Sequence, residues 1–107
     1  MIKNLAGKLR HYIKIQKPII DNNEKEIWQD FLELHSSVEA MHSKSANQAF
    51  IAMQLMDSSF YQFRIRFIKG LKNNMRIIYN DRYFYIKRII NHNEANIVLT
   101  IIAQESL

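Results

Sequence analysis

The sequence predicts a mainly β fold: a small antiparallel β-barrel or sandwich of five or six strands, with one helix in a long connection between the early strands. Two observations support this fold class. Several short segments alternate apolar and polar residues, and polar turns separate them. One further segment, residues 43–57, repeats its apolar side chains at helical spacing instead. The chain of 107 residues is expected to form a single domain over residues 1–107, with its helical excursion at about 43–57.

The first part of the chain predicts a strand, a turn and a second extended region. Residues 9–17 alternate with a period of two, so that one face of a strand carries Leu9, His11, Ile13 and Ile15. Pro18 has no N–H to donate to a sheet, so we expect the pairing to end there. Residues 21–24 are polar and favour a turn. Residues 26–38 fit either a helix or two extended pieces with a bend at residues 29–30, and we favour the strands.

The helix prediction depends on five apolar residues within 43–57. They follow i, i+3, i+4, i+7 and i+10 spacing, and they are Ala46, Ala49, Phe50, Met53 and Met56. Ser45 and Gln48 have the spacing of a capping box, in which each side chain satisfies a backbone N–H at the start of a helix. The stripe of Phe50, Met53 and Met56 has to be buried, either on its own barrel or on a neighbouring subunit, and the adaptable methionine side chain suits both.

The second half of the chain predicts a β-meander. Strands are expected over residues 60–67, 75–79, 82–90 and 97–103. Gly70 can adopt a positive φ in the first turn, and Asn80–Asp81 can form a two-residue hairpin turn. The apolar residues of 82–90 fall on both faces, which indicates burial on both sides or a bulge. The inner wall of the barrel should then consist of Ile13, Ile15, Phe63, Ile65, Phe67 and Leu99.

The sequence offers little that could support catalysis. It contains no cysteine, which excludes disulfides and Cys-containing metal sites. The four histidines are far apart, with no pair at metal-ligand spacing on one element, and two glycines cannot form a glycine-rich phosphate loop. We therefore expect no enzyme, no catalytic or metal-binding residue and no cofactor. No apolar stretch approaches the roughly 20 residues that cross a membrane, so no membrane association is expected.

Charge is distributed unevenly along the chain, whose formal net charge is +5. Residues 1–20 and 61–80 each carry five cations and no acid, whereas residues 21–40 carry six acids and a single lysine. Opposed patches of this kind suit a subunit that contacts copies of itself or a charged partner. Alternatively, a stripe of Arg64, Arg66 and Arg76 with Tyr83 and Tyr85 would suit a single-stranded nucleic-acid-binding barrel.

Six short segments occur in a characteristic order and spacing. They are residues 9–17 (LRHYIKIQK), 28–31 (WQDF), 63–67 (FRIRF), 75–79 (MRIIY), 82–86 (RYFYI) and 97–100 (IVLT). Together they resemble the tailed-phage head–tail joining proteins, also called head-closure proteins or head–tail adaptors, over almost the whole chain. One departure is Asp81, because the corresponding hairpin usually contains glycine in that family; Asn80–Asp81 can form a similar turn.

The resemblance implies a structural connector protein of a phage or prophage. Copies would assemble as a ring between the portal-adaptor protein above and a tail protein below, closing the DNA-filled head and providing the docking surface for the tail. The subunit could be a monomer in the host cytoplasm before assembly, and in the virion it could contact packaged DNA non-specifically. Two other functions remain open: a single-stranded nucleic-acid-binding barrel, or another phage neck or tail-completion protein.

We hypothesise that three groups of residues form the interfaces between subunits or with partners. The basic face would be presented by Arg64, Arg66 and Arg76. The complementary acidic edge would be formed by Glu24, Glu26, Asp30 and Glu33. The anchors on the helix would be Phe50, Met53 and Met56.

Overall fold

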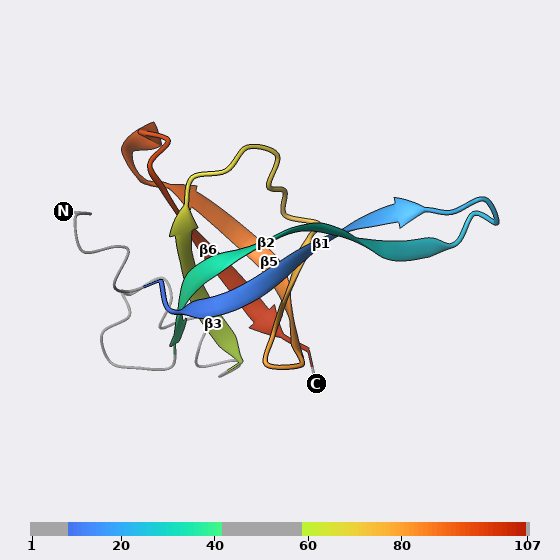
Figure 1. Cartoon of the computed structure of the whole chain (residues 1–107), viewed down its shortest axis with the longest axis horizontal. Coiled ribbons are helices and arrows are strands. Elements are labelled where there is room, and N and C mark those ends of the chain that lie inside the picture. The colour runs from blue at the N-terminus through green and yellow to red at the C-terminus, as the bar shows by residue number, and fades with distance from the viewer. Residues whose placement is uncertain (1–8, 42–58, 107) are drawn as a thin grey trace.

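Six antiparallel strands close into a barrel in the order β1-β2-β3-β6-β5-β4, as the computed structural model shows (Figure 1). The structure describes residues 9–41 and 59–106, so the predicted helix at 43–57 lies outside the described residues. The strands are β1 (His11–Ile20), β2 (Glu26–Ala40), β3 (Phe60–Arg66), β4 (Arg76–Tyr79), β5 (Arg82–Asn91) and β6 (Val98–Glu105). The mainly β fold class is therefore confirmed, as are the strands expected in the second half of the chain.

The interior of the barrel is filled by alternate residues of each strand. Its fully buried side chains include Ile13, Ile15, Phe63 and Ile65, and Phe67 packs half-buried against this cluster. The Phe63 ring meets the Phe84 ring edge-on, with the ring centroids 5.0 Å apart. The period-two alternation thus identified the inner wall correctly, because only one face of each strand can reach a closed core.

β1 and β2 extend well beyond the barrel as a hairpin. β1 pairs with β2 from His11 to Ile20, but it pairs with β4 only from Lys14 to Gln16. Residues 17–29, called the arm here, therefore form a two-stranded ribbon that projects from the barrel (Figure 1). The prediction that pairing ends at Pro18 is wrong: Pro18 lies opposite Trp28 within the ladder. A proline is tolerated there because β1 has a partner strand on one side only at this point.

β2 is one continuous strand with a bulge rather than two pieces, and the alternative of a helix is wrong. Ile15 pairs with Leu32 and Gln16 pairs with Asp30, so Phe31 is the extra residue. A bulge of this kind bends its strand and re-aims the side chain. The Phe31 ring packs against the core and the turn that contains Gly70.

The turns carry the backbone conformations that their residue types predict. Asn80 and Asp81 both have positive φ, at 53° and 60°, as the tight turn between β4 and β5 requires. Gly70 has a φ of 88°. β5 contains the expected bulge, where the register shifts between Ile86 and Arg88. The polar loop after β5 holds a short 3₁₀ turn, and no helix in the described residues is long and apolar enough to cross a membrane.

An ion pair joins the start of β5 to the end of β6. Arg82 donates two hydrogen bonds to Glu105, at 2.8 and 2.9 Å, and its guanidinium lies 5.1 Å from the centres of both the Tyr61 and Phe84 rings. This hydrogen-bonded cation lowers the pKa of the Glu105 carboxyl, although partial burial opposes the shift. The pair therefore stabilises the fold only while Glu105 is ionised.

Replacing Phe84 by Ala should lower the free energy of unfolding by about 3–5 kcal/mol, because it removes a fully buried ring and leaves a cavity between Phe63 and Tyr61. Urea unfolding followed by circular dichroism measures this loss. Ile97→Ala is the matched control, since Ile97 is exposed and its replacement should lower the free energy of unfolding far less. Equal losses in the two variants would contradict the assignment of the core.

Glu105→Gln should lower the free energy of unfolding by about 1 kcal/mol at pH 7, because the charge-assisted pair with Arg82 is lost. Glu105 has a lowered pKa in the folded state, so its contribution is present above the unfolded pKa of about 4.3 and disappears as the pH falls through the folded value. The wild-type and variant urea midpoints should therefore converge in acid. Glu39→Gln, at an exposed position on β2, is the control. A gap between wild type and Glu105→Gln that stays constant with pH would refute this role.

Candidate assembly surface

The three arginines proposed as a basic face lie on two opposite sides of the barrel. Arg64 and Arg66 are on β3, beside the buried Phe63 and Ile65, whereas Arg76 is on β4. In the closed ring of six strands, β3 and β4 are separated by two strands in both directions. The hypothesis of a single basic face is therefore corrected: β3 and β4 follow each other in the sequence but are not neighbours in this sheet.

Arg76 belongs to a cluster on the outside of the barrel, at the root of the arm. Its guanidinium lies between two aromatic rings, 4.3 Å from the centre of Trp28 and 4.5 Å from that of Tyr83. Its Nε donates a hydrogen bond of 2.8 Å to Gln16, whose amide donates one of 2.8 Å to Asp30. These five residues come from β1, β2, β4 and β5, and they are called the brace here. The brace joins the arm to the barrel wall.

Further contacts extend the brace on both sides. Tyr85 packs against Trp28, with the ring centroids 6.0 Å apart, and Lys14 lies 3.5 Å from the Asp30 carboxylate. The hydrogen bond from Gln16 and then the Lys14 charge lower the pKa of Asp30. Asp30 thus already has two partners within its own chain, Gln16 and Lys14.

The remaining predicted acidic residues are divided between two places. Glu24 lies in the loop at the end of the arm and Glu26 begins β2, so both are exposed at the tip. Glu33 lies farther along β2, beside the barrel, where its hydrogen bond raises the pKa of the Tyr12 phenol. Glu33 and Asp30 lie near each other on the outer face of β2, because the residues opposite them, Lys14 and Gln16, flank the buried Ile15. The helix anchors Phe50, Met53 and Met56 lie outside the described residues.

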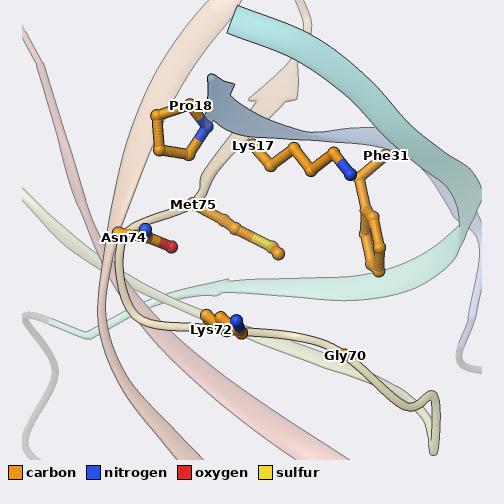
Figure 2. A pocket seen from close by; sticks show the side chains of 7 residues that line it. All are labelled: Lys17, Pro18, Phe31, Gly70, Lys72, Asn74 and Met75. Atoms are coloured by element: carbon orange, nitrogen blue, oxygen red, sulfur yellow. The ribbon is translucent and has the colours of Figure 1, made fainter. Parts of the chain in front are cut away.

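A cavity of about 270 Å³ opens at the root of the arm, on the side of the β3–β4 connection (Figure 2). This root pocket is lined by Lys17, Pro18, Phe31, Gly70, Lys72, Asn74 and Met75. Gly70 shapes it in two ways: its φ is positive, and a Cβ there would lie 3.3 Å from the Phe31 ring. Sequence reasoning missed this pocket, because its walls come from three separated segments and depend on the Phe31 bulge.

The arm also exposes apolar side chains near its tip. Ile20 and Ile27 are 65% and 40% exposed. They lie on alternate faces of the ribbon, since Ile20 pairs with Glu26 and Ile27 pairs with Ile19. The tip therefore combines apolar side chains with the acids Glu24 and Glu26 and with Lys25 between them.

The described histidines have structural partners rather than a shared site. Tyr79 and His11 are joined by a hydrogen bond of 3.0 Å, and His92 and Thr100 by one of 2.7 Å. His35 packs edge-on against Tyr12. Within residues 9–41 and 59–106, no group of three or more His, Asp or Glu side chains could hold a metal ion.

A model of the phage head completion protein family matches residues 5–106. The chain belongs to the phage head completion protein family. The matched range includes the residues of all six strands and of the arm. The resemblance to phage head–tail proteins noted from the six sequence segments is thereby confirmed.

Two solved structures share the fold of this head completion protein. Protein SF1141 from Shigella flexneri 2a superposes with a TM-score of 0.67 at 22% identity, covering 94% of this chain and 95% of that one. A chain from the virion of a native gene transfer agent particle superposes with a TM-score of 0.64 at 15% identity, covering 92% and 96%. No curated protein sequence matches the chain.

Arg76→Ala should loosen the arm while leaving the barrel folded. The change removes two cation–π contacts and a hydrogen bond to Gln16, so hydrogen exchange at arm amides should accelerate about tenfold, equivalent to about 1.4 kcal/mol. Hydrogen-exchange mass spectrometry compares arm peptides with peptides from β3 and β6. Arg66→Ala, an exposed arginine on the opposite side, is the control. Unchanged exchange in the arm would show that the brace does not stiffen it.

Proposed function

We propose that this protein is a connector subunit of a phage or prophage particle, which forms a ring between the portal adaptor and the tail and closes the DNA-filled head. The observation that carries the proposal is the match of the head completion family over residues 5–106. A protein that completes a filled head has to contact the portal side of the head and, after closure, the tail. The portal adaptor and a tail protein are therefore its proposed partners.

The place of action in this proposal is the virion, after a period as a free subunit in the host cytoplasm. A chain of the same fold occurs in the virion of a gene transfer agent. The barrel supports this role physically, because a closed sheet has no free edges along its wall and keeps its shape when its outside is covered by other subunits.

A ring of identical subunits needs two different surfaces on each copy, one that contacts the preceding copy and one that contacts the following copy. This chain offers such a pair. The arm projects from one side with acids and isoleucines at its tip, and most cations lie elsewhere on the described surface. The helix predicted at 43–57, with Phe50, Met53 and Met56, remains a further proposed contact between copies.

A role in catalysis or in single-strand binding is less well supported. The family is structural, and the aromatic side chains suggested as a stacking platform are already engaged: Arg76 covers one face of Tyr83, and Trp28 packs on Tyr85. Arg64 and Arg66 remain directed outward on β3, where they could contact the phosphates of packaged DNA without reading its sequence.

Disrupting the gene in the phage or prophage that encodes it should give heads that do not retain DNA and do not join tails, because the connector would be incomplete. Electron microscopy of the lysate, together with the amount of DNA protected from nuclease, measures both effects. Supplying the wild-type protein from a plasmid should restore tailed, filled particles. Normal infectious particles that lack the protein would refute the proposal.

A further inference from the structure

The tip of the arm and the root pocket have complementary chemistry. We propose that the arm tip of one copy docks in the root pocket of the next copy, so that the arm is the head-to-tail contact between subunits. This inference rests on the proposed ring and adds the surface by which its copies recognise each other.

The tip presents an apolar side chain with carboxylates beside it. Ile20 is 65% exposed and pairs with Glu26 in the ladder, and Glu24 stands in the adjoining loop. The carboxylate of Asp21 faces inward instead, accepting hydrogen bonds from the backbone N–H groups of Asn23 and Lys25 at 2.9 and 2.8 Å. The acids available to a partner at the tip are therefore Glu24 and Glu26.

The same contacts of Asp21 fix the shape of the loop. The Asp21 N–H donates to the Lys25 carbonyl at 2.9 Å, and the Glu24 N–H donates to the Asp21 carbonyl at 3.0 Å. A loop closed by four such bonds loses little conformational entropy on docking. The tip can thus present the Ile20 side chain to a pocket while its own backbone stays fixed.

The root pocket offers the matching chemistry. Phe31, Met75 and Pro18 give it an apolar lining, and Lys17 and Lys72 bring positive charge to the same cavity (Figure 2). The Lys17 ammonium lies 6.0 Å from the centre of the Phe31 ring. A cavity of 270 Å³ has the liquid volume of roughly nine waters, which accommodates an aliphatic side chain but not a folded element. An isoleucine flanked by carboxylates fits this description.

A copy cannot fill its own pocket with its own tip. Lys17 and Pro18 form part of the pocket, and the loop begins only after Ile20. With a rise of about 3.3 Å per residue, the paired ribbon carries Ile20 about 10 Å from Lys17, directed away from the barrel. In this proposal the occupant therefore comes from another copy, and a contact between two unlike surfaces closes into a ring when its rotation allows.

Engineered cysteines test the contact in assembled particles, since the natural chain contains none. The double variant Ile20→Cys with Asn74→Cys is supplied to the disrupted phage, and purified particles are oxidised and run on a non-reducing gel. Disulfides need Cα atoms within about 7 Å, so a ladder of dimers and higher multimers is expected. Ile20→Cys with Arg66→Cys, which places the second thiol on β3, is the control and should stay monomeric.

Particles that contain the variant as monomer only would overturn the docking contact while leaving the connector function intact. A cross-link from Ile20→Cys to a different virion protein would also overturn it, because the pocket's occupant would then not be a second copy. Absence of the wild-type protein from particles would instead contradict the proposed function.

A charge exchange provides the second test if the cysteine variants fail to assemble. Glu26→Lys and Lys72→Glu should each abolish tailed particles on their own, while the purified subunits keep the wild-type circular dichroism spectrum. The two changes combined should restore particles, since the opposite charges face each other again. If the combined variant folds but restores nothing, the pairing of tip and pocket is refuted.

Discussion

The closure of the barrel depends on three residues. β1 pairs with β4 only from Lys14 to Gln16, and this short seam converts an open sheet into a ring. Its middle residue, Ile15, is fully buried, and its last pair joins Gln16 to Arg76, whose side chains are also hydrogen-bonded. Core packing inside the wall and the brace outside it therefore stabilise the same three positions. Any change that opens this seam would expose the core and release the arm together.

The end of the seam also determines where the arm begins. Beyond Gln16, β1 and β2 have only each other, and an isolated two-stranded hairpin is marginally stable in water. The Phe31 bulge and the close approach of Gly70 anchor the root on one side, and the stacked Arg76 anchors it on the other. The root pocket lies beside the first of these supports, between Phe31 and the β3–β4 connection, so its shape depends on how the bulge attaches the arm.

Local sequence patterns were sufficient to predict the strands. The features that these patterns could not predict depend on which strands pair with each other in the sheet. Alternation identified the inner wall, and Asn80–Asp81 and Gly70 identified turns, because these signals depend on a residue and its neighbours. The prediction that pairing ends at Pro18 failed because a strand tolerates proline where no third strand lies beside it, and the sequence around Pro18 does not show which strands are neighbours. The prediction of a single basic face failed for a similar reason, because the strand order of the closed barrel places β3 opposite β4. The root pocket required the bulge and three separated segments, none of which has a signal of its own.

The charged side chains of the arm and its root fall into two groups in the fold. Asp30, Lys14 and Arg76 interact within the chain, at the root of the arm, and their effect is to stiffen it. Glu24 and Glu26 at the tip and Lys72 at the pocket remain at the surface, directed toward solvent or a partner. A stiff arm loses less freedom on docking than a flexible one, so in the proposed ring the internal charges would favour assembly without touching the neighbouring subunit. Glu24 and Glu26 are thus carried outward by a hairpin whose base is stabilised by Arg76, whereas Glu33 and Glu39 lie farther along β2, beside the barrel.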